Sequence, residues 1–527
     1  MQYCEPTYFL LFLPLVVLLY HFTPQKKRWV ILLIASYLFF ISLSRFLLVY
    51  LLMATLWIYV LARMIEKVQV KCKAEVKQYE RSERKAIKKK YQSVQRRYVG
   101  LGVIGLIGLL VVLKYSDFIG TNINVLLESF NTSIPVYRFM VPIGISFYSL
   151  QGVSYLVDVY REKIQADHHL GRLALYMSYF PQLMEGPICR YDQTAMALFE
   201  GKDLTSMNIR FGMQRILYGL IKKIVIADRL NPIISTVFKD YQQYDGGMMA
   251  LAMICYTCQL YMEFSGTIDV VLGSSQIFGV ALPENFKQPF FSKSISDFWA
   301  RWHITLGTWF KDYIYYPMSL SSPLKKLTKW GRKAIGHYYG PLLAGTIALF
   351  CVWFCNGVWH GDAWNYIFFG MYHFMLIFLA NIFAPLVSKF YEVTHISKDW
   401  FWVKGIRILK TVLFVCVGEL FFRAHGLKAG LGMFVKMVTD FTWASFENLS
   451  FLNLGVDSRD FIIVIITCVI IFIVSLCRER HISICLSIES KPIVIRWAIW
   501  YGLIFYLIIF GAYGVGYIPV DPIYAGF

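Results

Sequence analysis

Long uncharged apolar runs constrain this chain more than any other feature. A helix needs about 20 mainly apolar residues to cross the hydrocarbon core of a bilayer. Hydrophobic residue types make up 57% of the chain and charged residues only 16%, which excludes a typical soluble enzyme and a disordered chain. The sequence predicts an all-α polytopic membrane protein with about 11–13 transmembrane or re-entrant helices. The candidate runs lie at about residues 8–21, 29–44, 46–62, 98–113, 139–157, 211–228, 247–264, 340–359, 363–386, 405–422, 461–477 and 494–515.

The positive charge is concentrated in one segment. The chain carries a net charge of +19, and residues 63–97 alone hold 13 Lys and Arg against 4 Glu. A basic run beside a membrane span indicates topology and contact with anionic membrane lipid. No nucleic-acid recognition motif accompanies the charge, so we expect no nucleic-acid partner. The segment lacks Pro and Gly and is open to two interpretations, a surface helix or a solvated loop.

The basic residues also predict the orientation. Lys26, Lys27 and Arg28 follow the first run, and residues 63–97 follow the third, so both should be cytoplasmic. The intervening residues must then cross twice, as a tight hairpin that turns near Ser42–Arg45, with Met1 outside. Residues 284–318 mix aromatic and charged side chains, which favours interfacial or re-entrant helices that line a cavity.

Two histidines are candidates for chemistry. His360 ends an uncharged run of twenty residues. Gly357 and Gly361 flank it, and these glycines permit a helix break that would leave the imidazole accessible. An imidazole there could act as a general base, although a satisfied interfacial histidine is the alternative. His303 lies 57 residues earlier, so only tertiary folding could bring the two together.

Other polar groups have structural interpretations. His373 follows His360 by thirteen residues, which on a continuous helix is about 220° around and about 20 Å along, so it should serve helix packing. Glu419 precedes Arg423 by four residues, which favours a structural ion pair. No hydrolase motif and no metal-ligand spacing occurs, so no metal site is predicted and no cofactor-binding residues are identified.

Five sequence blocks, in family order over some 280 residues, resemble the membrane-bound O-acyltransferase family. The resemblance is to its bacterial branch, which contains proteins of alginate O-acetylation and of teichoic-acid D-alanyl transfer. The end of the chain, DPIYAGF, departs from the family's aromatic ending. The blocks are VPIGISFYSLQGVSYLVDVYR at 141–161, YFPQLMEGPICRY at 179–191, the segment 264–317 that contains FWARWH, NGVWHGDAWNYIFFGMYH at 356–373 and ELFFRA at 419–424.

The resemblance implies a site and an organisation for the chain. It implies that His360 is the principal catalytic residue, a general base, and that His303 is the second active-site residue. It also implies a central catalytic tunnel, for which the candidate lining residues are Trp299, Trp302, Trp309, Trp359, Asn356 and Asn365. The expected parts are N-terminal transmembrane helices at 1–62, a basic cytoplasmic segment at 63–97, the catalytic core at 98–430, and an extracytoplasmic loop with two transmembrane helices at 431–527.

The resemblance further implies a multi-pass enzyme of the bacterial cell membrane. It would move an acetyl group from a cytosolic thioester, acetyl-CoA, for O-acetylation of a cell-surface polysaccharide. Acetyl-CoA would be a substrate, with no bound cofactor, and the partner would be an extracytoplasmic SGNH-type acetyltransferase or acetyl carrier. The alternatives are D-alanyl transfer from a carrier protein to teichoic acid, a conduit or transporter without chemistry, and a scaffold for a surface transferase.

Overall fold

The computed structural model describes residues 1–513, 517, 519 and 520, and within these ranges the regular structure is entirely helical. Six helical segments in the described part are long and apolar enough to cross a membrane, which confirms the all-α membrane class. They are Gln25–Val76, Arg84–Phe130, Ser322–His360, Trp364–Thr394, Ser458–Glu479 and Ile493–Phe510. The final DPIYAGF, residues 521–527, lies outside the described residues.

The chain divides into two units, and the first comprises residues 1–216 and 270–283 of the described chain. Its helices are α1 (Leu13–Phe22), α2 (Arg28–Ser44), α3 (Leu48–Val76), α4 (Arg84–Leu127), α5 (Ile145–Tyr160), α6 (Leu170–Ser178), α7 (Tyr191–Glu200) and the first part of α8 (Ser206–Leu220), with a π-helical turn at Tyr8–Phe12. Between α2 and α3, Arg45 adopts a left-handed φ of 46°. The turn lies where the hairpin near Ser42–Arg45 was predicted, and the two membrane crossings on either side of it stay a prediction.

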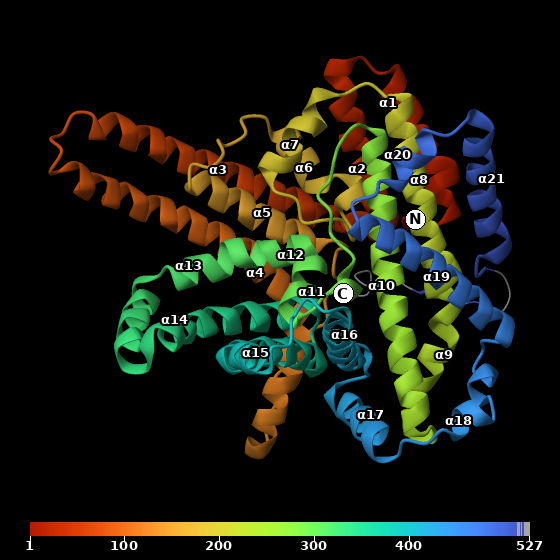
Figure 1. Cartoon of the computed structure of the whole chain (residues 1–527). Coiled ribbons are helices and arrows are strands. Elements are labelled where there is room, and N and C mark those ends of the chain that lie inside the picture. The colour runs from red at the N-terminus through yellow and green to blue at the C-terminus, as the bar shows by residue number, and fades with distance from the viewer. Residues whose placement is uncertain (514–516, 518, 521–527) are drawn as a thin grey trace. The chain divides into compact units, whose positions relative to one another are not determined.

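The basic segment 63–97 is helical over most of its length. Helix α3 continues to Val76 and α4 begins at Arg84, so the two long helices run side by side as a hairpin (Figure 1). The Tyr91 hydroxyl donates to the Glu75 carboxylate and fastens α4 to α3. Of the two interpretations that the sequence left open, the structure supports a surface helix.

The predicted span at 139–157 differs from the structure. Residues 132–142 are not helical, and α5 begins only at Ile145. The physical reason is local: Pro142 has no amide hydrogen to donate, and Gly144 adopts a left-handed φ of 76°. The apolar composition of this run therefore reflects burial of α5 in the unit, where nearly every residue of the helix is inaccessible.

The second unit comprises residues 217–269 and the described residues after 283. Its helices include α9 (Asp228–Lys239), most of α10 (Gly246–Ile277), α11 (Ile295–Arg301), α12 (Ile304–Phe310), α13 (Tyr316–Ser319), α14 (Ser322–His360), α15 (Trp364–Thr394), α16 (Phe401–Arg423), α17 (Leu427–Thr439), α18 (Ala444–Glu447), α19 (Ser458–Glu479), α20 (Ile484–Glu489) and α21 (Ile493–Phe510). Two π-helical segments, Ile221–Ala227 and Lys311–Tyr315, precede α9 and α13.

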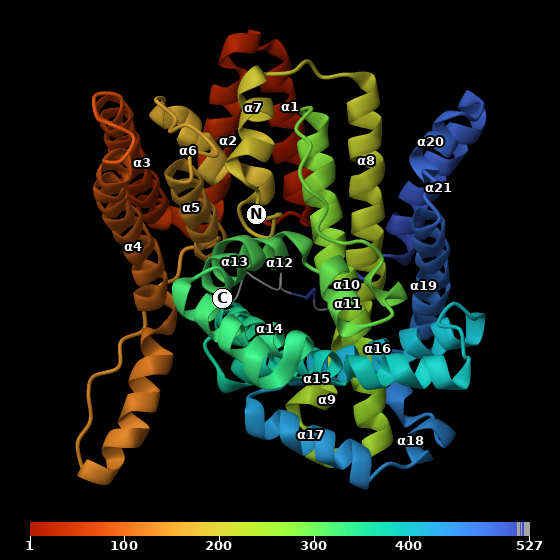
Figure 2. The ribbon, with the colours of Figure 1, turned by 60° about the vertical axis from the view of Figure 1, so that its left-hand side comes forward.

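Helices α14 and α15 form a closely packed pair that positions the candidate site (Figure 2). The backbones approach where Gly357 meets Gly370: a Cβ on Gly370 would lie 2.4 Å from the Trp353 carbonyl oxygen. Glycine at both positions permits this approach. Helix α14 is also kinked at Gly336, whose φ is 88°, just before the apolar run that begins near residue 340.

Buried charges in this unit are mostly paired. Lys222 Nζ lies 2.5 Å from Asp269 Oδ2, and Arg229 pairs with Asp460. Such pairing offsets the cost of placing charges in an apolar environment. The predicted Glu419–Arg423 ion pair is wrong. Within the part of the chain that the structure describes, these side chains form no salt bridge, and the Arg423 guanidinium lies 5.6 Å from the centre of the Phe238 ring.

Candidate active site

His360 is the last residue of α14. Its side chain is 5% exposed, and the next residue, Gly361, leaves the helix in an extended conformation. A Cβ on Gly361 would lie 2.2 Å from the Tyr366 ring, so a larger residue here would displace that ring. The sequence-predicted helix break beside His360 is therefore confirmed. The rings of Trp359, Phe369 and Phe422 meet the imidazole edge-on, with centroids 5.1, 5.9 and 5.3 Å away.

His303 lies in the turn between α11 and α12. It is 2% exposed and has a left-handed φ of 45°, an uncommon conformation that surrounding contacts must hold. Asn285 supplies those contacts: its Oδ1 accepts from the Thr305 amide and hydroxyl at 3.1 and 2.9 Å and lies 3.3 Å from His303 Nδ1. A proton on Nδ1 satisfies this last contact and makes Nε2 the unprotonated ring nitrogen.

The electrostatic environment keeps His303 neutral. Burial, with a smaller contribution from nearby His360, lowers the pKa of His303 well below its ordinary value. A neutral imidazole can orient or polarise a reacting group but does not supply a permanent positive charge.

The structure brings the two predicted histidines together. The centre of the Trp359 ring lies 5.8 Å from that of His303 and 5.1 Å from that of His360. Trp359 thus contacts both imidazoles, although 57 residues separate them in sequence.

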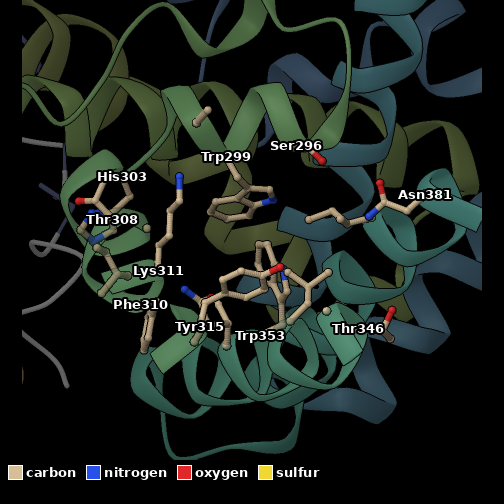
Figure 3. A pocket seen from close by; sticks show the side chains of 18 of the residues that line it. Ser296, Trp299, His303, Thr308, Phe310, Lys311, Tyr315, Thr346, Trp353 and Asn381 are labelled. Carbon is tan, nitrogen blue, oxygen red and sulfur yellow. The ribbon is translucent and has the colours of Figure 1, made fainter. Parts of the chain in front are cut away.

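A cavity of about 700 Å³ opens beside His303 (Figure 3). Its walls come from α11, α12, the π-helical segment Lys311–Tyr315, α14 and α15. Of the predicted site residues, His303, Trp299 and Asn356 line it. Lys311 and Tyr315 also line it, and sequence reasoning did not single them out. The segment 284–318 therefore lines a cavity, as its mixed composition predicted.

The remaining predicted residues lie elsewhere in the same unit. Trp302 is stacked on Phe298, and Trp309 packs against Tyr313, so neither ring lines this cavity. The Asn365 amide donates to the carbonyls at the end of α16, including that of Ala424 at 3.2 Å. Asn365 thereby joins the start of α15 to the end of α16.

His373 is closer to the site than the sequence geometry predicted. The continuous-helix premise is wrong, because the chain breaks at Gly361 and turns back into α15. The Phe369 ring contacts both His360 and His373, and His373 Nδ1 accepts a hydrogen bond from Trp299 Nε1 at 3.2 Å. His373 is completely buried and holds Trp299 in the cavity wall, so its packing role is supported by different geometry.

Comparison with known proteins identifies similar acyltransferases. The sequence model of the membrane-bound O-acyltransferase family matches residues 145–332. A probable alginate O-acetylase of Pseudomonas aeruginosa is 30% identical over 86% of this chain and 79% of its own length. The peptidoglycan O-acetyltransferase of Helicobacter pylori is 29% identical over 65% of each chain.

A third relative represents the other branch. The teichoic acid D-alanyltransferase of Bacillus subtilis is 31% identical over 55% of this chain and 70% of its own. The similarity to the alginate O-acetylase extends over most of both proteins, and the site blocks lie within a helical membrane fold. The chain belongs to the membrane-bound O-acyltransferase family.

Proposed function

We propose that this membrane acyltransferase moves acetyl groups from a cytosolic thioester to the outside, for O-acetylation of a cell-surface polysaccharide. The observation that carries the proposal is the pair of buried imidazoles on Trp359, one of which, that of His303, lines a cavity large enough for an acyl donor. Two relatives whose names specify O-acetylation support acetyl over other acyl groups. Two relatives whose similarity covers 86% and 84% of this chain are named for alginate, a polysaccharide.

His360 is the proposed general base. It accepts the proton of the acceptor hydroxyl as that oxygen attacks the thioester carbonyl carbon. The C–O ester bond forms, the C–S bond breaks, and the proton passes to the departing thiolate. A neutral imidazole has a ring nitrogen lone pair that can accept this proton. General-base assistance of this kind is worth roughly 10²–10⁴-fold.

His303 is proposed to orient the reacting groups through its Nε2. The donor is proposed to be acetyl-CoA, consumed as a substrate. The outer acceptor is a polysaccharide hydroxyl or a hydroxyl of an SGNH-type extracytoplasmic partner that completes the transfer. Trp299 and Asn356 belong to the donor cavity in this proposal.

The test is the acetyl content of surface glycans in cells with and without the protein. The proposal expects glycan O-acetyl groups to disappear on deletion and return with the wild-type gene. Loss of D-alanyl esters with unchanged acetyl content would instead favour the D-alanyl alternative, which the Bacillus subtilis relative supports less extensively. Unchanged esters of both kinds would contradict an acyltransferase role on surface glycans.

A further inference from the structure

The α3–α4 hairpin carries a basic face that the proposed acyl transfer does not use. Residues 84–97 hold seven Lys and Arg and no Asp or Glu. A groove of about 820 Å³ lies along this part of α4, and its lining includes six cations and no carboxylate. All six side chains are exposed. The cations are Arg81, Arg84, Lys85, Lys88, Lys89 and Arg96.

The helical period gathers these side chains on one face of α4. From Lys85 to Arg96 the lining residues follow the spacing i, i+3, i+4, i+7, i+8 and i+11, which is a single stripe of an α-helix about 16 Å long. The opposite face, which includes Ile87, Tyr91 and Val94, is half-buried, and the Tyr91 hydroxyl bonds to α3. The packing of the hairpin therefore leaves the basic stripe uncovered.

The acids of the hairpin do not neutralise this stripe. On α3, Glu66 forms a salt bridge within its own helix, and Glu75 accepts the hydrogen bond from Tyr91. In the turn, Glu80 and Glu83 do not line the groove. The described part of the chain contains no salt bridge to any of the six groove cations. Their charge is therefore available to a ligand.

Two of the guanidinium groups are held by neutral acceptors, which fix them without neutralising their charge. Arg84 Nε donates to the Tyr79 carbonyl at 2.9 Å, and Arg96 Nε donates to the Tyr160 hydroxyl at 3.1 Å. Like charges four residues apart on a helix, such as those of Arg84 and Lys88, repel each other and destabilise the helix. A multiply charged anion in the groove would remove this repulsion.

We infer that this groove is a binding site for a ligand that carries several phosphate groups. Phosphate oxygens suit the planar fork of arginine and the point charge of lysine. Gln92 and Ser93 add neutral donors to the stripe. No aromatic side chain lines the groove, so it provides no stacking surface for a base or a sugar. The site lies outside the catalytic cavity, and the inference does not depend on the proposed acyl transfer.

Two sources of phosphate can reach the stripe. It begins at Arg96, beside the apolar run that is predicted to enter the membrane, and extends away from that run toward the turn between α3 and α4 (Figure 1). Headgroup phosphates of anionic lipids lie at the near end, and soluble phosphate compounds of the cytoplasm have access to the far end. The chemistry that the groove recognises is the same in both cases, and the experiment has one arm for each source.

The first arm measures binding of inorganic tripolyphosphate to the full-length protein in neutral detergent by isothermal titration calorimetry. The groove variant combines Lys85→Gln, Lys88→Gln and Lys89→Gln, which removes charge and leaves helix propensity nearly unchanged. Its Kd should rise about tenfold, because several charge contacts to one anion are lost. Binding by the wild-type protein should also weaken when the salt concentration rises, since salt screens exposed charges.

The matched control removes the same charge elsewhere on the protein. It combines Lys325→Gln, Lys326→Gln and Lys329→Gln, three exposed cations of α14 that do not line the groove. Its Kd should stay within about twofold of wild type. Equal weakening by both variants, with unfolding temperatures matched to wild type, would overturn the assignment to the groove. Lys88→Gln alone, compared with Lys326→Gln, repeats the test if a triple variant does not fold.

The second arm extracts the proteins from bilayers that contain phosphatidylglycerol and phosphatidylethanolamine and counts the retained lipids by native mass spectrometry. Fewer phosphatidylglycerol molecules on the groove variant than on the control would assign the site to headgroup phosphates. Equal retention, with tripolyphosphate binding weakened only in the groove variant, would assign it to a soluble ligand. If neither probe distinguishes the groove variant from the control, the inference is wrong. Tighter binding of a hexaglutamate peptide than of tripolyphosphate would contradict the assignment to phosphate.

Discussion

Gly357→Ala tests whether the close crossing of α14 and α15 positions His360. The added Cβ would lie 2.6 Å from the Tyr366 carbonyl oxygen and 3.1 Å from the Ile367 Cα. Ordinary contact begins near 3.4 Å, so the helices must separate by about 0.8 Å, three residues before His360. Backbone atoms cannot rotate away as a flexible side chain can. A misplacement of about 1 Å can cost about 10²-fold in rate, so we expect a 30- to 100-fold loss of transfer.

The matched control is Gly405→Ala on α16, where an added Cβ meets no atom within 4 Å. This variant should retain wild-type transfer and gain about 0.5–1 kcal/mol from helix propensity. In Gly357→Ala the same gain is opposed by strain of about 1–3 kcal/mol, so its unfolding temperature should fall. Both variants are compared by acetyl transfer in proteoliposomes at equal protein content. A Gly357→Ala protein that transfers within threefold of wild type would refute this account of the crossing.

Three further predictions concern topology and the supporting histidines. A single Cys placed at position 88, in a protein without other reactive Cys, should resist an impermeant thiol reagent in intact cells, because positively charged segments favour the cytoplasmic side. Rapid labelling from outside would contradict the predicted orientation. His373→Gln should retain more transfer than any substitution of His360, since the amide can still accept from Trp299; equal abolition in folded proteins would place His373 in the chemistry. His303→Asn should retain more transfer than His303→Ala, because the proposed role is orientation; identical rates would remove the need for a polar group there.

The sequence predicted the features that depend on local pattern. The turn near Arg45 and the break beside His360 follow from charge and glycine placement within a few residues, whereas composition left 63–97 open between a surface helix and a loop. The run at 139–157 was misjudged because apolar composition alone does not separate a span from a buried helix, and Pro142 with Gly144 delays the helix start. A separation of four residues on a helix permits an ion pair between Glu419 and Arg423 but does not require one.

The site itself required tertiary structure. Sequence resemblance indicated His303 and His360, but their shared contact with Trp359 joins segments 57 residues apart. The role of Asn285 in holding the turn at His303 also depends on a contact across 18 residues. Lys311 carried no motif that would distinguish it from other cations, and only the cavity makes its position informative.

The most direct test of the account is acetyl transfer by His360→Gln. Glutamine can hydrogen-bond but cannot act as a base near pH 7, so the substitution separates packing from proton transfer. The measurement is transfer of radiolabelled acetyl from acetyl-CoA to a hydroxyl acceptor in proteoliposomes, with membrane insertion and thermal unfolding matched to wild type. The account predicts a loss of roughly 10²–10⁴-fold in a folded protein. Transfer at the wild-type rate would contradict general-base catalysis by His360 and favour a conduit or scaffold.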